Sequence, residues 1–258
     1  MKSWLRSVAR RLPVHGLRGR LQRYLRYRAF VRDYRDFSRL AAQGPARFHL
    51  RWEDRFPCLE DRTAGTDFDR HYVYHTAWAA RVVARTRPVE HVDIASSLYF
   101  CSMVSAFVPI RFLDYRPADL RLEGLKSEFG DLMRLPFADQ SVPSLSCMHV
   151  VEHVGLGRYG DPLDPDGDRK AMAELERVVA RGGTLLFVTP VGRSRIQFNA
   201  HRIYGYRQVV EQFAQLELRQ FALLPDYPSE GGLIPDADPA LADRQTYGCG
   251  CFWFERKP

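Results

Sequence analysis

Three acidic residues end consecutive short apolar segments that predict strands. Asp93 follows an apolar run, Asp114 closes the segment 110–114, and Asp131 closes the segment 125–131. Ligands of an open α/β sheet bind outside the carboxyl ends of the strands, so we expect the three carboxylates to meet in one crevice. The second acid is suited to accept hydrogen bonds from ribose hydroxyls, and the third from an adenine amino group. One such acid alone would be a helix cap or a surface charge, but three at consecutive strand ends predict an adenosyl site.

The turn after Asp93 consists of small residues, Ala95, Ser96 and Ser97, and a helical pattern follows it. A strand, a tight turn and a helix allow the backbone to approach an adenosyl cofactor closely. The glycines expected in such a turn are absent, and an ordinary strand–helix joint is the alternative interpretation. The candidate cofactor residues are Asp93, Ala95, Ser97, Asp114, Asp131, Leu132 and His149.

Imidazoles and a carboxylate gather after the fourth predicted strand. His149, Glu152 and His153 lie close together there, and His201 follows the fifth strand. Neutral imidazole near pH 7 can take a proton from an attacking group, so His153 and His201 are the candidate general bases, with Glu152 beside them. Packing of His149 within the sheet is the alternative for that residue.

A second polar group, Asn199, Arg202 and Tyr204, surrounds His201 in the sequence. Such a group can hold a sugar or a phosphate, and it can equally be a surface loop. We predict that these three residues contact the substrate, because they project from the side of the sheet where the methyl group of the cofactor should lie.

Strand and helix patterns alternate along most of the chain. We expect helices at 68–85, 97–106, 166–181 and 206–216, and strands at 89–94, 110–114, 125–131, 145–151, 184–189, 217–224 and 248–255. Gly182 and Gly183 are expected to stop the helix 166–181. The alternation predicts an α/β fold with a doubly wound, mostly parallel, seven-stranded Rossmann-like sheet. The last two strands have no crossover helix between them, which predicts an antiparallel last strand.

The positive charge is concentrated at the start of the chain. The net charge is +7, and residues 1–39 contain twelve Lys or Arg and two Asp, so the rest of the chain is net negative. Apolar residues at spacings of three and four predict one or two amphipathic helices here, broken near Pro13–Gly16. We divide the chain into a basic N-terminal extension, 1–45, and a domain, 46–258. Residues 1–40 are expected to meet an anionic membrane surface, or to pack their apolar stripe on the domain or a partner.

Five cysteines without a C-x-x-C pair predict reduced thiols and a cytoplasmic location, at the inner face of the membrane if the extension binds lipid. Cys249 and Cys251 are expected to share one face of a strand as small core residues. Because the basic charge is confined to the extension, nucleic acid is not an expected partner.

Residues 89–256 resemble the class I S-adenosylmethionine-dependent methyltransferases. The resemblance rests on D-I-A-S-S from Asp93, G-D-L-M-R-L-P-F-A-D-Q-S-V from Gly130, V-V-E-H-V after the fourth strand, and E-R-V-V-A-R-G-G-T-L-L-F-V-T-P. More closely, V-V-E-H-V-G-L-G-R-Y-G-D-P-L-D-P-D-G-D and F-N-A-H-R-I-Y are similar to the family termed domain of unknown function 268. Its members often accompany surface-polysaccharide genes, which implies a glycan-related acceptor. Ala95 and Ser97 stand where the class usually has glycine.

The H-V-V-E-H spacing is similar to E-x-x-E-H in metal-assisted members of the superfamily, where a later histidine completes the site. The resemblance implies a divalent metal that would lower the pKa of acceptor hydroxyls. Its ligands would be His149, Glu152, His153 and His201. In many metal-free members of the superfamily, Glu-His also follows this strand. We favour the interpretation that no metal is bound here.

These features together predict an enzyme that transfers a methyl group from S-adenosylmethionine to an oxygen of a glycan or a related small acceptor. The alternative is a component of a polysaccharide assembly complex that binds the cofactor without catalysis. Ala95 and Ser97 favour that alternative, and His153 and His201 disfavour it. A nicotinamide-dependent oxidoreductase is disfavoured by the missing G-x-G-x-x-G and by the paired closing strands.

Overall fold

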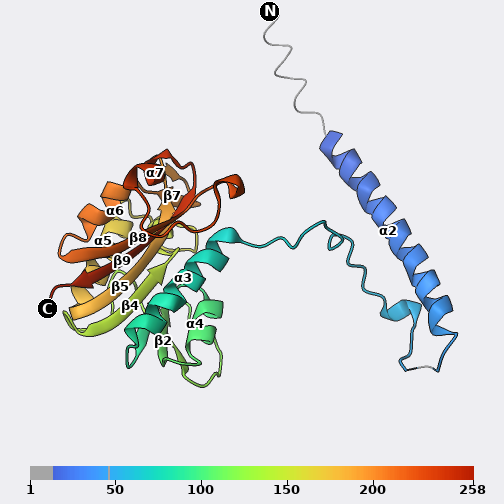
Figure 1. The fold of residues 1–258 in the computed structure, drawn as a ribbon, viewed down its shortest axis with the longest axis horizontal. Coiled ribbons are helices and arrows are strands. Elements are labelled where there is room, and N and C mark those ends of the chain that lie inside the picture. Colours follow the sequence, from blue (N-terminus) through green and yellow to red (C-terminus); the bar gives the residue numbers. More distant parts are fainter. Residues whose placement is uncertain (1–13, 46) are drawn as a thin grey trace, which may run out of the picture. The chain divides into compact units, whose positions relative to one another are not determined.

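The computed structural model describes residues 14–45 and 47–258. The chain forms two compact units, one reaching to Asp67 and the other comprising Phe68–Pro258 (Figure 1). The predicted boundary near residue 45 falls inside the first unit, because the segment beyond it packs back on the first helix. Residues 1–13, the beginning of the stretch predicted to meet lipid, lie outside the described residues.

The first unit contains the helix α2, Val14–Ala41, and the short 3-10 helix η1, Trp52–Asp54. The ring of Trp52 lies against the rings of Phe30 and Tyr34, with centroids 6.3 and 5.0 Å away. The helix α2 begins at Val14 and runs through Gly16 without interruption, while Pro13, where the predicted break begins, lies outside the described residues. One glycine costs a helix only about 1 kcal/mol, which the surrounding helix-forming residues outweigh. No helix in the described ranges has the length and apolar character needed to cross a bilayer.

The second unit is built on one sheet of seven strands with the order β3-β2-β1-β4-β5-β9-β8. Its strands are β1 His91–Ile94, β2 Ile110–Asp114, β3 Leu125–Phe129, β4 Val142–Met148, β5 Val179–Val191, β8 Leu216–Leu224 and β9 Gly248–Arg256. The strands β1 to β5 pair in parallel, and β9 lies antiparallel between β5 and β8. This topology confirms the predicted doubly wound, mostly parallel sheet with an antiparallel last strand.

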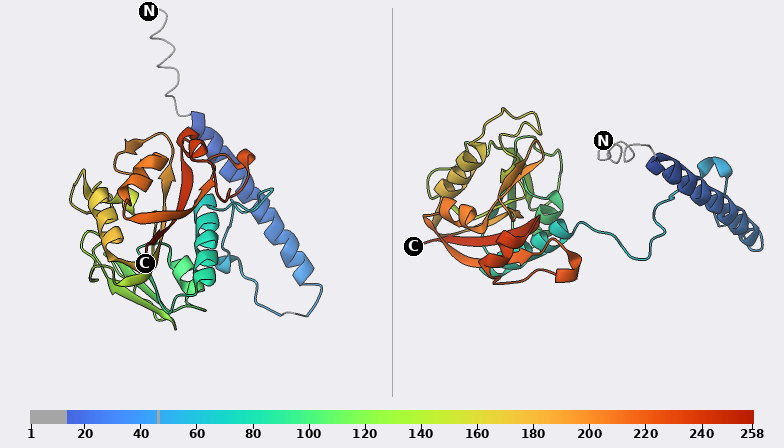
Figure 2. Two further views of the ribbon diagram at one scale, coloured as in Figure 1. Left: turned by 60° about the vertical axis from the view of Figure 1, so that its left-hand side comes forward. Right: turned by 90° about the horizontal axis from the view of Figure 1, so that it is seen from above.

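Helices cover both faces of the sheet (Figure 2). One face carries α3 Arg70–Thr86 and α4 Leu98–Val104, and the other carries α5 Gly167–Val178, α6 Tyr206–Gln212 and α7 Pro239–Arg244. Successive side chains of a strand point to opposite faces, so β5 contributes to both layers of core. Leu185 and Phe187 pack on the side of α5, while Leu186 and Val188 pack on the side of α3.

Gly182 and Gly183 lie within β5, which corrects the prediction that they stop a helix. The helix α5 already ends at Val178, and β5 begins at the next residue. Gly182 has a φ of +67°, and a Cβ on Gly183 would lie 2.8 Å from the carbonyl oxygen of Ala180. The register between β4 and β5 shifts at this point, which is typical of a β-bulge. Glycine suits both positions, because it adopts a positive φ without strain and has no Cβ to clash.

Candidate active site

The carboxylate of Asp93 is buried beneath the turn that follows β1. One oxygen accepts a hydrogen bond from the backbone N–H of Ser96 at 3.0 Å, and the other accepts one from the hydroxyl of Ser146 on β4. Burial raises the pKa of Asp93 to about 6, against the opposing effect of the hydrogen bonds from Ser146 and Ser96. Asp93 was predicted to contact the cofactor. In the structure it positions the turn instead, because both of its oxygens are engaged within the protein.

The turn Ala95–Ser97 is held against β4. Ala95 has a φ of +53°, in the left-handed region that costs a residue with a Cβ roughly 1–2 kcal/mol. The hydroxyl of Ser96 accepts the backbone N–H of Met148 at 2.9 Å, at the end of β4. Ser97 precedes α4 without a capping hydrogen bond from its side chain. The turn is therefore fixed at the carboxyl ends of β1 and β4.

The three predicted acids lie along one edge of the sheet, because they accompany the adjacent parallel strands β1, β2 and β3. One oxygen of Asp114 accepts the backbone N–H of Arg116 at 2.7 Å, and one oxygen of Asp131 accepts that of Met133 at 2.9 Å. Within residues 14–45 and 47–258, no other hydrogen bond engages these two carboxylates, so the second oxygen of each is available to a ligand. The side chain of Leu132 packs in the core.

A groove of about 1100 Å³ lies between α3 and α4 and reaches the ends of β1 and β2. Its walls between the two helices are mainly apolar, with Val73, Ala77 and Met103 among the lining residues. At the edge of the sheet it is bordered by Ser96, Ser97 and Asp114. The groove thus brings a carboxylate and the end of the β1 turn to one apolar cavity.

A second cavity, the polar pocket, has a volume of about 720 Å³ and lies beyond the carboxyl end of β4. Its walls come from the start of α3, from the 3-10 helix η2 (Val151–His153), from the hairpin of β6 (Arg195–Gln197) and β7 (His201–Ile203), and from Tyr247 before β9. Five predicted site residues line it: His149, Glu152, His153, Asn199 and His201. Asp69 and Tyr72 line both the groove and the polar pocket, so the two cavities adjoin.

The two candidate bases each have one ring nitrogen fixed by a hydrogen bond. Nδ1 of His153 donates to the carbonyl of Ala200 at 2.6 Å, which leaves Nε2 to accept a proton. Nε2 of His201 donates to the side-chain oxygen of Gln197 at 2.6 Å, which leaves Nδ1 free for the same purpose. Burial lowers the pKa of His201, so its neutral form prevails near pH 7. The two ring centroids are 6.3 Å apart.

Glu152 is buried next to both His149 and His153. Its Oε1 accepts a hydrogen bond from Nδ1 of His149 at 2.8 Å and lies 3.9 Å from Nε2 of His153. Its Oε2 is buried and has no partner in the described part of the chain. Burial disfavours the charged form of His149, but the sulfur of Cys249 and the carboxylate of Glu152 outweigh that effect and raise its pKa to about 10. The carboxylate therefore holds His149 in place at the wall of the pocket.

Arg202 and Tyr204 do not serve as the predicted substrate contacts. The guanidinium of Arg202 is buried, donates to the carbonyl of Val154 at 2.6 Å and pairs with Asp168 at 3.4 Å. The hydroxyl of Tyr204 donates to the carboxylate of the same Asp168 at 2.8 Å. Both side chains brace the segment behind the pocket, because alternation along β7 turns them away from its opening. Asn199, in the hairpin turn, does line the pocket.

Several pocket residues escaped the sequence analysis. His71 and Tyr247 stack on each other with centroids 5.0 Å apart. The guanidinium groups of Arg116 and Arg158 lie 5.0 and 5.1 Å from the ring centroid of Tyr159. His71 precedes the apolar stripe of α3, and the others lie in loops without periodicity. The one indication of these residues in the sequence is their type, since aromatic residues and arginines occur near His153.

The four predicted metal ligands do not gather as one set. Among the described residues, the group of His, Cys, Asp and Glu side chains whose ligand atoms come together consists of His71, His149 and Cys249. Of the predicted ligands, only His149 belongs to that group. The metal set implied by the sequence resemblance is therefore not the one that this geometry provides.

The architecture is that of known methyltransferase structures. The N-methyltransferase NodS of Bradyrhizobium japonicum, solved with S-adenosyl-L-homocysteine, is 12% identical, with a TM-score of 0.50 over 78% of this chain and 92% of its own. A Bacillus halodurans protein whose methyltransferase assignment is itself provisional is 14% identical, with a TM-score of 0.50 over 71% of this chain and 99% of its own. At these identities the likeness shows the fold alone, which is that of the class I S-adenosylmethionine-dependent methyltransferases.

The family model described as "Caenorhabditis protein of unknown function, DUF268" matches residues 139–220. This stretch includes β4, the residues His149–His153 and the hairpin that carries His201. Both parts of the predicted resemblance, to the class I methyltransferase fold and to this family, are confirmed. No curated protein matches the sequence.

Proposed function

We propose that this protein is an S-adenosylmethionine-dependent methyltransferase that methylates an oxygen of a glycan or a related small acceptor. The observation that carries the proposal is the border between the two cavities. The groove bordered by Asp114 adjoins the polar pocket, whose wall contains His153 and His201. A donor in the groove and an acceptor in the pocket would meet beside Asp69 and Tyr72, which line both.

The residues at the strand ends suit an adenosyl cofactor. S-Adenosylmethionine supplies a methyl group on an activated sulfonium, so the protein has to align two reactants and remove a proton. The second oxygen of Asp114 can accept hydrogen bonds from ribose hydroxyls. The turn after β1, held by Asp93 and Ser96, presents its backbone to the same edge of the sheet.

His153 is the residue best placed to take the proton of the acceptor. The carbonyl of Ala200 fixes its tautomer, so Nε2 carries the lone pair. When Nε2 takes a proton, the carboxylate of Glu152 at 3.9 Å stabilises the resulting imidazolium. His201, also in the wall of the pocket, is the second candidate base.

The lining of the pocket suits a carbohydrate. Three tyrosine rings, those of Tyr72, Tyr159 and Tyr247, supply apolar faces, and Asn199 and Arg158 supply hydrogen-bonding groups. Sugars combine an apolar ring face with hydroxyls, so both kinds of group have a counterpart. This composition supports a glycan acceptor and agrees with the polysaccharide context that the sequence resemblance implies.

The proposal is tested by measuring cofactor binding and methyl transfer separately. Calorimetry with S-adenosylmethionine should give saturable binding, and the protein should transfer labelled methyl from it to a carbohydrate fraction of a cell extract. Carbon-13 NMR of the labelled product should show a methyl group on oxygen. A methyl group on nitrogen or carbon would overturn the oxygen acceptor, and failure to bind the cofactor would overturn the enzyme itself.

A second candidate is a cofactor-binding component of a polysaccharide assembly complex without catalysis. Ala95 favours it, because a methyl group stands in the left-handed turn where the class usually has glycine. Binding without transfer in the same experiment would select this candidate.

In either case we expect a cytoplasmic location with peripheral membrane contact through residues 1–40, where Leu21, Tyr24 and Leu25 are exposed among arginines.

A further inference from the structure

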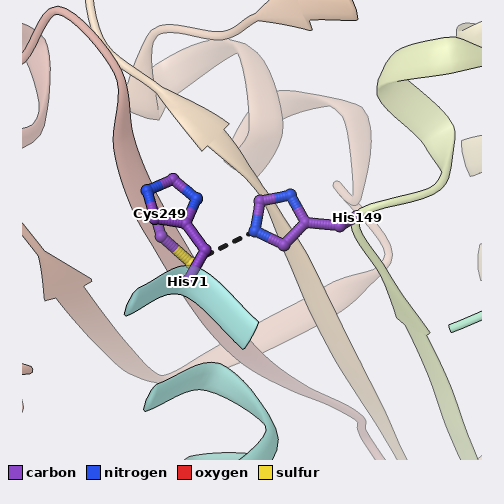
Figure 3. A group of neighbouring side chains, drawn as sticks. All are labelled: His71, His149 and Cys249. Carbon is purple, nitrogen blue, oxygen red and sulfur yellow. Dashed lines mark hydrogen bonds between the residues drawn. The ribbon is translucent and has the colours of Figure 1, made fainter. Parts of the chain in front are cut away.

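Three side chains from distant parts of the sequence, His71, His149 and Cys249, meet in the structure (Figure 3), and the first two of them line the polar pocket. His71 lies at the start of α3, His149 follows β4, and Cys249 lies on β9. One ring nitrogen of each histidine and the sulfur of Cys249 all lie within 4.8 Å of one another. Nε2 of His149 is 3.5 Å from that sulfur, and the ring of His71 stacks on the ring of His149 with centroids 5.2 Å apart.

Each of the two imidazoles has a second partner that orients it. Nδ1 of His149 donates to Oε1 of Glu152 at 2.8 Å, which leaves Nε2 directed at the sulfur of Cys249. A ring nitrogen of His71 hydrogen-bonds to the backbone carbonyl of Tyr247, which leaves its other nitrogen as a donor of electrons. Carboxylates and carbonyls that orient the far nitrogen of a histidine are a regular feature of metal sites, where they fix the tautomer and increase basicity.

The surroundings of this group do not resemble ordinary core packing. His149 has a φ of +57°, a backbone conformation that residues other than glycine rarely adopt. A third imidazole, that of His75, is fully buried edge-on to His149, and its Nε2 has no hydrogen-bond partner in the described ranges. Burying several imidazoles and a thiol together is unfavourable unless their polar atoms bind something. A ligand held by His71, His149 and Cys249 would lower this cost for those three residues, and Nε2 of His75 lies outside that set.

The chemistry of the three ligand atoms selects the ion. Two imidazole nitrogens and one sulfur are ligands that Zn²⁺ binds well, whereas Mg²⁺ and Ca²⁺ require oxygen. Bond lengths of roughly 2.0–2.3 Å place tetrahedral ligand atoms about 3.5 Å apart. Nε2 of His149 and the sulfur of Cys249 already have this separation, so only the nitrogen of His71 has to approach, by about 1 Å. His71 is only half-buried and can make this movement by turning its side chain.

We propose that His71, His149 and Cys249 bind one Zn²⁺ ion. His71 and His149 line the polar pocket, so the fourth coordination position faces the pocket and holds a water molecule. On binding, Nε2 of the protonated His149 and the thiol of Cys249 both release their protons to solvent, so that the imidazole binds through its lone pair and the sulfur binds as a thiolate, with no change in oxidation state. The site differs from the metal set implied by the sequence resemblance, and it does not depend on methyl transfer.

The test uses the full chain, freed of metal by a chelator and titrated with Co²⁺ as a spectroscopic substitute for Zn²⁺. A tetrahedral site with one thiolate gives visible d–d absorption and a near-ultraviolet sulfur-to-cobalt charge-transfer band. Zn²⁺ should displace Co²⁺ and abolish both signals at one equivalent. Absence of the charge-transfer band in the wild-type protein would overturn the proposal.

Variants identify the ligands, and the chain offers a matched control. Cys249→Ser should abolish the charge-transfer band, and Glu152→Gln should keep the band but weaken affinity by roughly 10–100-fold. Cys251→Ser is the control, because Cys251 is buried on the same strand with its sulfur 4.0 Å from that of Cys249. Equal loss of the band in Cys251→Ser would refute the assignment.

A folding defect in Cys249→Ser would be recognised by circular dichroism. The half-buried His71 then provides the second variant, His71→Ala, which removes a ligand without opening the core. It should lose on the order of 100-fold in Zn²⁺ affinity while keeping the melting temperature of the metal-free protein. Unchanged affinity in a folded His71→Ala protein would contradict the site.

Discussion

Asp93 and His91 are joined through a single hydroxyl, that of Ser146. The hydroxyl of Ser146 donates to the carboxylate of Asp93, and Nε2 of His91 lies 2.8 Å from the oxygen of that hydroxyl. Nδ1 of His91 continues the chain to the hydroxyl of Ser144 at 2.7 Å. Burial lowers the pKa of His91 to about 3, so the imidazole is neutral and the chain of hydrogen bonds can run in either direction.

The first prediction follows from the raised pKa of Asp93. The folded protein holds this proton up to about pH 6, whereas the unfolded chain loses it near 3.8. The folded state therefore loses stability relative to the unfolded chain as the pH rises from about 4 to 6, by on the order of 2–3 kcal/mol. Asp93→Asn should remove this loss, because the amide can donate to Ser146 and the chain of hydrogen bonds reverses.

The measurement is urea unfolding of both proteins between pH 4 and pH 7. The free energy of unfolding of Asp93→Asn should vary less with pH and should match or exceed the wild-type value at pH 7. An equal slope for both proteins would show that Asp93 is not the group responsible.

The second prediction concerns cofactor affinity. Asp114→Ala removes the acceptor proposed for the ribose hydroxyls. A charged hydrogen-bonding partner contributes roughly 1.5–3 kcal/mol, so affinity for S-adenosylmethionine should fall about 10–100-fold in calorimetry. Asp119→Ala removes an exposed acid nearby and should leave the affinity unchanged. Equal affinities for Asp114→Ala and the wild type would exclude the proposed ribose contact.

The third prediction separates catalysis from binding. His153→Ala should lower kcat by roughly 100-fold or more, because a positioned general base contributes about that much. The affinity for the cofactor should stay within twofold of wild type. His201→Ala should lower kcat less than His153→Ala does, because His201 is the second candidate base. His49→Ala, at an exposed position in the first unit, is the control and should keep the wild-type kcat. Full kcat in both pocket variants would remove the proposed bases.

The fourth prediction uses the strained turn after β1. Ala95→Gly should stabilise the fold by about 1 kcal/mol or less, because glycine adopts a φ of +53° without the Cβ penalty but is more flexible when unfolded. It should also bind S-adenosylmethionine more tightly, since the backbone could approach the cofactor more closely. Differential scanning calorimetry and titration measure the two effects. A destabilised or weaker-binding variant would contradict the assigned conformation.

The fifth prediction concerns the two compact units. A chain that begins at Phe68 should unfold cooperatively, with a melting temperature within a few degrees of the full chain, because its sheet and both layers of helices are complete. Loss of the cooperative transition would show that the first unit contributes to the core of the second.

The sequence predicted the parts of the fold that depend on local pattern. The apolar runs of β2 and β5 and the stripe of α3 specify their elements, and the absence of a crossover helix indicated the antiparallel β9. The bulge at Gly182 and Gly183 could not be foreseen, because a glycine pair has the same appearance after a helix as within a strand. The three-residue strands β6 and β7 are too short to have a period.

The site was harder to predict than the fold, because residue types do not reveal where side chains point. His149, Glu152, His153 and His201 were named and line one pocket. Asp93, Arg202 and Tyr204 were also named, yet their polar atoms serve the protein itself, and only tertiary structure shows this. The sequence predicts core packing for Cys249, since nothing in it indicates the distance of this residue from His71 and His149.

The position of β9 in the sheet also determines when the pocket can be completed during synthesis. The strand β8 is made before β9 but reaches the rest of the sheet only through it. The strand β8, although already translated, must therefore wait for Gly248–Arg256 before it can join the sheet. Any ion or substrate that needs Tyr247 or Cys249 would find no binding site on the nascent chain until that last pairing has occurred.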